Sequence, residues 1–458
     1  MRMAALLLGA TAVLPTTDAF DIPSIKQSLT FTQKKLSTLG KQQTLCAFKT
    51  CEPDSISIPK EYALANQGSI GITSFNDETF NIQTVTTTML LPHGLRSHQK
   101  AAKTTVMDLY NAHQEHGIGC IISLPCGYGK TVLALNIASE LGMKCLILTH
   151  TSMLAEQWIQ AINQYIPNAV IGQVKQNMFD VDGKTHVIAS LHSVAKRDYE
   201  WSNAGIGMLI SDETHRAAAI QLSQALSKVP SKYRLGLSAT LNRPDGLTAF
   251  LYASIGRPIF NINRERNNEL RVFGIHLKEG CMIDKHLWNG QINTMGMLTG
   301  LTDDRIDARR RQLLAATWLR YCVGKQRKII VVSDRIQLLK DLELLIPDLN
   351  TGFMIGETKT AEREQAREAD IIFGSYQIVG EGLDLANLDT LMFLTSRKGK
   401  NMITQAVGRI LRTGGKPPVV IDFVDANKVF KNMYKARCVL YRQMGAEIID
   451  YDEGKNRI

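Results

Sequence analysis

Short apolar runs alternate with amphipathic stretches from residue 118 onward. The apolar runs predict buried strands at residues 118–124, 145–149, 187–190, 208–211 and 234–237. Residues 131–141 carry apolar side chains at helical spacing and stop before Gly142, a common residue at helix ends. Strands that alternate with helices are typical of a parallel sheet covered by helices, so this series predicts an α/β domain over residues 93–262.

A second series follows a polar, irregular stretch at residues 263–310, which we interpret as a connector. Its strands are predicted at residues 328–332, 371–374, 391–394 and 419–423. This series predicts another α/β domain over residues 311–458. Residues 21–92 lack the alternation and contain turn-prone clusters, so we expect a small N-terminal accessory region there.

The first twenty residues have a character of their own. Arg2 precedes an apolar run at residues 3–14, and small residues follow it, roughly as in a signal peptide. The run is too short to span a bilayer, and no other segment has membrane-spanning character. An organelle-targeting segment and an over-extended gene start both account for residues 1–20. Apart from this run, we expect an intracellular protein, in the nucleus or the cytoplasm.

Length and charge narrow the class of protein. A chain of 458 residues is too long for one compact core. Lys and Arg number 53 against 43 Asp and Glu, a formal net charge of +10 that suits a polyanionic partner and equally suits simple solubility. The eight cysteines form no CxxC pair, so we expect free thiols in a reducing compartment rather than a zinc site.

A glycine-rich segment joins the first predicted strand to the first predicted helix, with the sequence Leu124-Pro-Cys-Gly-Tyr-Gly-Lys-Thr131. This is the context that a phosphate-binding loop requires, and it disfavours a chance Gly-Lys-Thr in a surface loop. Gly127 and Gly129 allow the backbone N–H groups to face phosphates. Lys130 can reach the β and γ phosphates, and the Thr131 hydroxyl can bind Mg²⁺.

Two carboxylates end another predicted strand, in the sequence Met208-Leu-Ile-Ser-Asp-Glu-Thr-His215. Asp212 is expected to hold Mg²⁺, and Glu213 to orient and deprotonate an attacking water. A solvated acidic pair is the alternative interpretation. The phosphate loop upstream favours the catalytic one.

The second domain carries Gln405-Ala-Val-Gly-Arg-Ile-Leu-Arg412, which places Arg409 and Arg412 on one face of a helix. Two such cations can act as arginine fingers that stabilise the charge of a transition state, while a solvated basic helix face is the alternative. Residues 379–384 form a glycine-rich turn shortly upstream. In that turn, Asp384 is expected to contact a nucleotide ribose or to relay domain closure.

Together these residues resemble the superfamily 2 helicases, in order from Leu95 to about Arg412. Residues 95–99 are similar to the family's adenine-reading segment, residues 212–215 to its DExH box, and residues 238–240 to the Ser-Ala-Thr motif that links hydrolysis to strand movement. The resemblance implies two tandem RecA-like α/β domains that use ATP and Mg²⁺, with coupling roles for His215, Ser238 and Thr240. The nucleotide-binding set that it implies is Arg96, Gln99, Cys126, Gly127, Tyr128, Gly129, Lys130, Thr131, Gly382, Asp384 and Gln405.

Four stretches are similar to the branch that contains the XPB helicase and the helicases of poxviruses and other large DNA viruses. Leu124-Pro-Cys-Gly matches that branch's form of the loop, and Leu154-Ala-Glu-Gln-Trp158 its Glu-Gln-Trp motif. Arg243-Pro-Asp245 stands where XPB-like enzymes have Arg-Glu-Asp, and its proline departs from that pattern. Residues 328–335 and 423–441 look most like the large-virus group, whose members act as DNA-dependent ATPases, some in releasing transcripts.

Contacts to a nucleic acid are expected from small hydroxyl residues and scattered cations, because such motors grip mainly the sugar-phosphate backbone. By resemblance the expected contacts are Thr149, Thr151, Ser193, Ser333 and Arg335, each of which is equally well a polar residue at a strand end. Trp158 has two interpretations, as a base-stacking residue or as part of the core.

The sequence therefore predicts an ATP-dependent DNA translocase or 3′-to-5′ helicase. We expect it to act as a monomer and to have no membrane as a partner. A DExH-type RNA helicase is the second interpretation. A non-catalytic nucleic-acid-binding assembly factor is the third. Four intact residues argue against it, namely Lys130, Glu213, Arg409 and Arg412.

Overall fold

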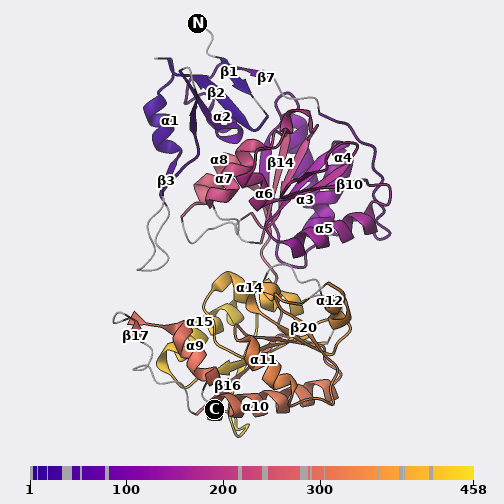
Figure 1. Ribbon diagram of the computed structural model, residues 1–458, viewed down its shortest axis with the longest axis vertical. Helices are drawn as coiled ribbons and strands as arrows, with labels where there is room; N and C mark the ends of the chain where they lie inside the picture. The colour runs from indigo at the N-terminus through magenta and orange to yellow at the C-terminus, as the bar shows by residue number, and fades with distance from the viewer. Residues whose placement is uncertain are drawn as a thin grey trace. The chain divides into compact units, whose positions relative to one another are not determined.

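The computed structural model describes residues 4–7, 9–17, 19–32, 44–51, 54–77, 82–214, 219–239, 246–278, 287–288, 291–303, 305–358, 360–380, 385, 387–411 and 416–458. The chain divides into two compact units, residues 1–263 and residues 264–458 (Figure 1). Each unit contains a large sheet with helices packed against it.

The first unit is built on an eight-stranded sheet of order β11-β10-β12-β9-β13-β14-β8-β15. Only β10 and β11 pair antiparallel, and the other neighbours are parallel. The strands are β8 (Gly119–Ser123), β9 (Cys145–Thr149), β10 (Ile171–Lys175), β11 (Met178–Phe179), β12 (His186–Ser190), β13 (Met208–Ser211), β14 (Tyr233–Ser238) and β15 (Arg257–Asn261). The central strands β8, β9 and β13 are buried along their whole length, so they appear in the sequence as continuous apolar runs.

Helices cover both faces of this sheet (Figure 1). One core cluster takes side chains from α3 (Ser97–Ala112), α4 (Lys130–Leu141) and α5 (Ser152–Tyr165), among them Leu133 and Trp158. The other takes side chains from α6 (Leu191–Lys196), α7 (Ala219–Lys228) and α8 (Thr248–Ile255), among them Leu222 and Phe250. The short helix η1 (Trp201–Asn203) adds Trp201 to the second cluster.

The N-terminal residues form a five-stranded sheet of order β5-β6-β2-β1-β7. Its strands are β1 (Ala4–Leu7), β2 (Thr11–Pro15), β5 (Lys49–Cys51), β6 (Ser55–Pro59) and β7 (Ser74–Asp77), accompanied by α1 (Ile22–Ser28), α2 (Lys60–Asn66) and the pair β3 (Thr30–Thr32) and β4 (Thr44–Cys46). The apolar run near the start of the chain thus supplies two inner strands. The sheet does not have the boundary expected at residue 20, because β1 and β2 pair with β7 and β6 from the region after it.

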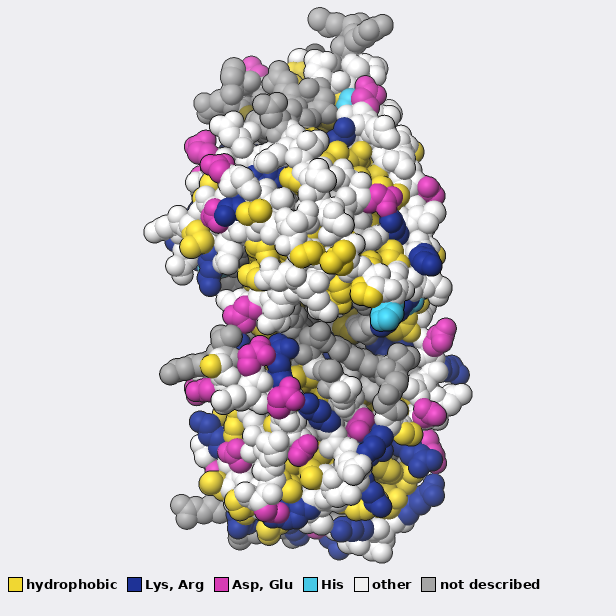
Figure 2. Space-filling view, turned by 90° about the vertical axis from the view of Figure 1, so that its right-hand side faces the viewer, with side chains coloured by type: hydrophobic (Ala, Val, Ile, Leu, Met, Phe, Trp, Pro, Cys, Tyr) yellow, Lys and Arg dark blue, Asp and Glu magenta, His cyan; other side chains and the backbone are white. Residues whose placement is uncertain are grey.

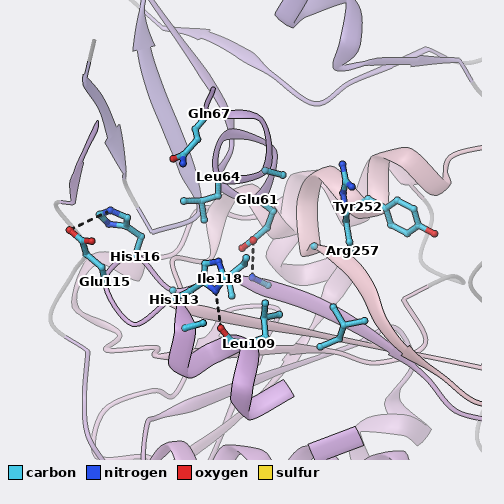
Figure 3. Close-up of a pocket in the computed structure, with 16 residues that line it drawn as sticks. Glu61, Leu64, Gln67, Leu109, His113, Glu115, His116, Ile118, Tyr252 and Arg257 are labelled. Atoms are coloured by element: carbon cyan, nitrogen blue, oxygen red, sulfur yellow. Dashed lines mark hydrogen bonds and ion pairs between the residues drawn. The ribbon is translucent and has the colours of Figure 1, made fainter. Parts of the chain in front are cut away.

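Two buried charges fasten α2 to the first unit's large sheet. Lys60 donates from Nζ to the carbonyl oxygens of Ser231 (3.0 Å) and Lys232 (2.7 Å). Glu61 accepts the backbone N–H of Gly119 at 2.7 Å, at the start of β8 (Figure 3). A cavity of about 510 Å³ lies beside this contact, lined by α2, the end of α3 and the start of β15.

The second unit has a seven-stranded parallel sheet of order β20-β21-β19-β22-β23-β16-β24. Its strands are β16 (Arg271–His276), β19 (Ile329–Val332), β20 (Thr351–Met354), β21 (Ile371–Gly374), β22 (Thr390–Phe393), β23 (Val419–Val424) and β24 (Glu447–Asp452), and β17 (Leu287–Trp288) pairs with β18 (Gln291–Ile292). The helices are α9 (Thr294–Asp303), α10 (Arg305–Gly324), α11 (Ile336–Glu343), α12 (Thr360–Arg367), α13 (Tyr376–Gly380), α14 (Lys400–Ile410) and α15 (Lys428–Gln443).

The α/β prediction with parallel sheets is confirmed, and every predicted strand is present with ends within one residue of those expected. The stretch interpreted as a connector differs from expectation. It contains β16, which pairs with both β23 and β24 inside the second sheet. In the chain as far as the structure describes it, no helix has the length and apolar character needed to cross a membrane.

Candidate nucleotide site

The glycine-rich segment runs from the end of β8 to the start of α4, as a phosphate loop does. Gly127 and Gly129 have φ values of +84° and +75°, a left-handed conformation that glycine adopts without strain. A Cβ atom on Gly129 would lie 2.4 Å from Nε2 of Gln99, so a larger residue would displace that side chain. The loop conformation therefore depends on glycine at this position.

Side chains at the start of α3 form hydrogen bonds with backbone carbonyl groups of the phosphate loop. Gln99 is buried, accepts the N–H of Arg96 at 2.9 Å and donates from Nε2 to the carbonyl of Gly129 at 3.0 Å. Arg96 reaches the carbonyl of Gly127 at 3.4 Å. His98 contacts the carbonyl of Tyr128 at 3.1 Å and packs against its ring. The predicted adenine-reading residues and the loop are thus one hydrogen-bonded assembly.

Lys130 and Glu213 meet at the centre of the site. Nζ of Lys130 lies 3.2 Å from Oε1 of Glu213 and 3.4 Å from the carbonyl of Leu124. Burial by itself would lower the pKa of Lys130, but nearby negative charge, that of Glu213 first, outweighs it and leaves the pKa raised. The ammonium is therefore charged at neutral pH and ready to pair with a phosphate.

Asp212 lies beside this pair and is fixed from two sides. Its Oδ2 accepts the indole N–H of Trp158 at 2.9 Å, and its Oδ1 accepts the backbone N–H of Glu213 at 2.8 Å. Burial, with the charge of Glu213 added, raises the pKa of Asp212 to about 6 against the opposing effects of Lys130 and Trp158. A divalent cation would oppose this shift, so a carboxylate in this position suits Mg²⁺.

The backbone around the acid pair is strained and well supported. Glu213 has a φ of +45°, uncommon for a residue with a side chain, and such conformations gather at functional sites. The Thr214 hydroxyl donates toward the carbonyls of Ser211 (2.9 Å) and Leu237 (3.2 Å). The N–H of Leu124 donates to the carbonyl of Ser238 at 3.0 Å. The acid pair, the phosphate loop and the start of the Ser-Ala-Thr motif are thereby joined. His215 and Thr240 lie outside the described residues.

Two predicted residues of the second unit lie on α14. Arg409 is largely buried, and its Nε donates to the carbonyl of Val379 at 3.3 Å. Gln405 is buried on the same helix. Gly382, Asp384 and Arg412 fall outside the part of the chain that the structure describes.

The predicted nucleic-acid contacts of the first unit lie at strand and helix ends. Thr149 ends β9 and is buried. Thr151 caps α5 by accepting the N–H of Leu154 at 3.3 Å. Ser193 is buried in α6 and accepts the N–H of Gln176 at 3.0 Å. The hydroxyls of Thr151 and Ser193 thus already take part in local structure.

In the second unit, Ser333 is fully buried, and its hydroxyl contacts that of Thr395 at 3.2 Å and accepts the N–H of Arg335 at 2.9 Å. Arg335 is the residue before α11 and is partly exposed. Of this pair, the Arg335 guanidinium is the group better placed to meet a strand.

Sequence reasoning did not assign the roles of His98, Thr214 or the Trp158 indole. Each acts through a partner distant along the chain: Tyr128, Leu237 and Asp212, respectively. The Glu-Gln-Trp resemblance drew attention to Trp158 without revealing its partner. The fully buried ring of Trp158 favours the core interpretation over base stacking.

Comparison with known proteins gives two matches to family models. The family described as "Type III restriction enzyme, res subunit" matches residues 92–243, and the "Helicase conserved C-terminal domain" matches residues 311–414. A protein of Acanthamoeba polyphaga mimivirus named as an ATP-dependent RNA helicase is 30% identical over 414 residues, which cover 86% of this chain and 76% of the relative.

The XPB helicase/translocase subunit of general transcription and DNA repair factor IIH from Danio rerio is 26% identical over 317 residues, covering 64% of this chain and 40% of that protein. The solved structure of S. cerevisiae Dbp5 bound to RNA and ADP BeF3 aligns with a TM-score of 0.53 at 11% identity, over 79% of this chain and 94% of Dbp5. That likeness shows a shared fold.

The fold, the phosphate loop with its acid pair and the two family matches define an ATP-hydrolysing helicase. The chain belongs to the superfamily 2 helicases, in the XPB-like branch that includes helicases of large DNA viruses.

Proposed function

We propose that this helicase is a DNA-dependent ATPase that moves 3′ to 5′ along a single strand, in transcription or repair. The ATPase part of the proposal is carried by one observation, the contact of Lys130 with Glu213 at 3.2 Å beside the phosphate loop. The preference for DNA is supported by the XPB-like stretches, above all Leu124-Pro-Cys-Gly and Glu156-Gln-Trp158.

Each residue of the first unit has a distinct task in this proposal. The loop N–H groups and Lys130 bind the β and γ phosphates. Asp212 and the Thr131 hydroxyl hold Mg²⁺, which when bound neutralises phosphate charge. Glu213, released from Lys130 as the phosphates bind, orients the water and takes its proton. Gln99 and Arg96 contact the base, with Cys126 and Tyr128 lining the loop.

The second unit contributes cations in this proposal. Arg409 and Arg412 act as arginine fingers, and Gln405, Gly382 and Asp384 complete the nucleotide contacts. Ser238, Thr240 and His215 couple hydrolysis to strand movement. Thr149, Thr151, Ser193, Ser333 and Arg335 are the proposed strand contacts.

The test is phosphate release with single-stranded DNA, duplex DNA and RNA of equal length, followed by unwinding of tailed duplexes of both polarities. We expect DNA to stimulate turnover more than RNA. Lys130→Ala and Glu213→Gln should each abolish hydrolysis, because one removes the phosphate-binding cation and the other the general base. Unchanged turnover in both variants would refute the assignment.

An RNA helicase is the second candidate, and the name of the mimivirus relative favours it. Stronger stimulation by RNA than by DNA in the same assay would select it. A non-catalytic assembly factor predicts no stimulated phosphate release with either polymer.

A further inference from the structure

The second unit contains a cavity of about 710 Å³ that none of the assignments above uses. It lies between the segment that precedes α14, the first turns of α14, and α15. This volume is within the usual range for ligand sites and is large enough for a nucleotide.

Four cations line the cavity. The charged residues among those that line it are Arg397, Lys398, Lys400 and Arg437, and no acidic side chain appears among its described lining residues. Lys398 and Lys400 are exposed at the rim. Over the visible face of the second unit as a whole, Lys and Arg side chains are interspersed with Asp and Glu (Figure 2). The cavity therefore presents positive charge to an incoming ligand.

Each of the two arginines pairs with an aspartate that does not line the cavity. Arg437 is 2% exposed and donates through Nε and Nη2 to the two carboxylate oxygens of Asp422, both at 2.7 Å. Arg397 pairs with Asp334 and lies over the ring of Tyr376. Because these acids offset the arginine charges, the net attraction for an anion comes from Lys398 and Lys400.

Apart from Arg437, the buried lining of the cavity, which forms its floor, is apolar. Ile403 of α14 and Met433 of α15 are buried there, and Leu440 is half-buried. A ligand that suits this site has an anionic group for the rim and a flat apolar body for the floor. A nucleotide in a single strand has both, since its phosphate is charged and its base offers an apolar face whatever the sequence.

We infer that this cavity binds one nucleotide of a nucleic-acid single strand, with the phosphate against Lys398 and Lys400 and the base over Ile403 and Met433. The inference rests on the proposed function and adds a strand site to it. Helix α14 also carries Arg409, nine residues after Lys400, which is a rise of roughly 14 Å along one rigid helix. A strand held at the first turn is thereby linked mechanically to the proposed arginine finger.

The inference is tested by the binding of fluorescent oligo(dT) to the full chain over a series of salt concentrations. The double variant Lys398→Ala/Lys400→Ala removes two phosphate contacts, so its Kd should rise on the order of tenfold and its salt slope should fall by roughly 1.4. The matched control Lys325→Ala/Lys340→Ala removes the same charge from exposed positions outside the cavity and should bind as the unaltered protein does. Thermal unfolding verifies that each variant is folded.

A third variant, Ala436→Trp, fills the cavity without changing its charge. It should weaken oligo(dT) binding and leave the salt slope unchanged, because no phosphate contact is lost. Two results would overturn the inference and leave the proposed function standing, provided that the unaltered protein binds oligo(dT). In one, Lys398→Ala/Lys400→Ala has the Kd and salt slope of the unaltered protein. In the other, Lys325→Ala/Lys340→Ala loses as much affinity as Lys398→Ala/Lys400→Ala does. If the unaltered protein binds neither DNA nor RNA, both the inference and the proposed function are wrong.

Discussion

Trp158 holds the carboxylate that we propose as a Mg²⁺ ligand. Its indole N–H is 2.9 Å from Oδ2 of Asp212, and its ring is packed in the core of the first unit. Replacing it by Phe keeps an aromatic ring but removes the donor. Partners that orient a metal ligand are commonly worth tenfold or more in metal affinity. Trp158→Phe should therefore raise the Mg²⁺ concentration for half-maximal ATP turnover by about tenfold.

Trp201→Phe is the matched control, because Trp201 is a second buried indole of the same unit that packs against Phe179 and Tyr199. Both variants lose core volume, so both should lower thermal stability. Only Trp158→Phe should shift the Mg²⁺ titration. Equal Mg²⁺ requirements in the two variants would show that Trp158 serves packing alone.

His186 gives the first unit a specific sensitivity to acid. Burial lowers the pKa of His186 from 6.5 to about 4, because the charged imidazolium is disfavoured at the start of β12. Between these pH values the unfolded chain binds a proton that the folded chain does not, so stability falls as the pH drops from about 6.5 to 4. The full effect is about 3 kcal/mol.

His186→Gln cannot titrate in this range, so its free energy of unfolding should vary less with pH between 6.5 and 4 than that of the unaltered protein. Urea unfolding at several pH values measures the difference. His113→Gln is the matched control, because it removes an exposed imidazole of the same unit. A His186→Gln profile parallel to that of the unaltered protein contradicts the prediction.

At the scale of elements, α2 is attached to the large sheet by charge. Glu61 accepts the N–H that begins β8, and Lys60 lies 3.9 Å from its other oxygen. Glu61→Ala would leave a buried ammonium without its carboxylate and a buried N–H without an acceptor. Removing one partner of a buried pair costs about 3 kcal/mol or more. We expect a loss of that size in urea unfolding of the full chain.

Glu115→Ala provides the comparison for Glu61→Ala. Glu115 lines the same cavity (Figure 3), but its side chain is 86% exposed. Its removal should change stability by less than about 0.5 kcal/mol. A Glu61→Ala variant as stable as Glu115→Ala would show that this contact does not hold α2 in place.

The strands were predictable from sequence where burial on both faces makes them continuous apolar runs, as in β8, β9 and β13. Strand β16 was missed because Arg271 and His276 at its ends and Gly274 within it interrupt that pattern. The phosphate loop and acid pair were predictable because their residues are adjacent in the chain. The partners of Trp158 and Glu61 were not, since these contacts span 54 and 58 residues and depend on packing between distant elements.

At the scale of the whole molecule, the charged residues that we propose for ATP hydrolysis come from both units. The first supplies Lys130, Asp212 and Glu213, while the second supplies Arg409 on α14. A nucleotide can be bound by the loop of the first unit alone, since that loop and its lysine contact the phosphates. Hydrolysis should in addition need the second unit, so binding and turnover are expected to respond to different residues.

Arg409→Ala separates these steps. An arginine finger stabilises charge that develops only in the transition state, so its loss should lower turnover on the order of a thousandfold and leave ATP affinity nearly unchanged. Arg409 also donates to the carbonyl of Val379, so Arg409→Lys is measured as a second variant. Lysine keeps the positive charge but lacks the planar guanidinium group, so the turnover of Arg409→Lys should also be low. The control is Arg320→Ala, which removes an exposed cation of the same unit and should hydrolyse ATP at the normal rate. Binding of a fluorescent nucleotide measures ATP affinity, and phosphate release by the same preparations measures turnover. If Arg409→Ala lost affinity and turnover to the same extent, Arg409 would support the fold of the site and not the reaction.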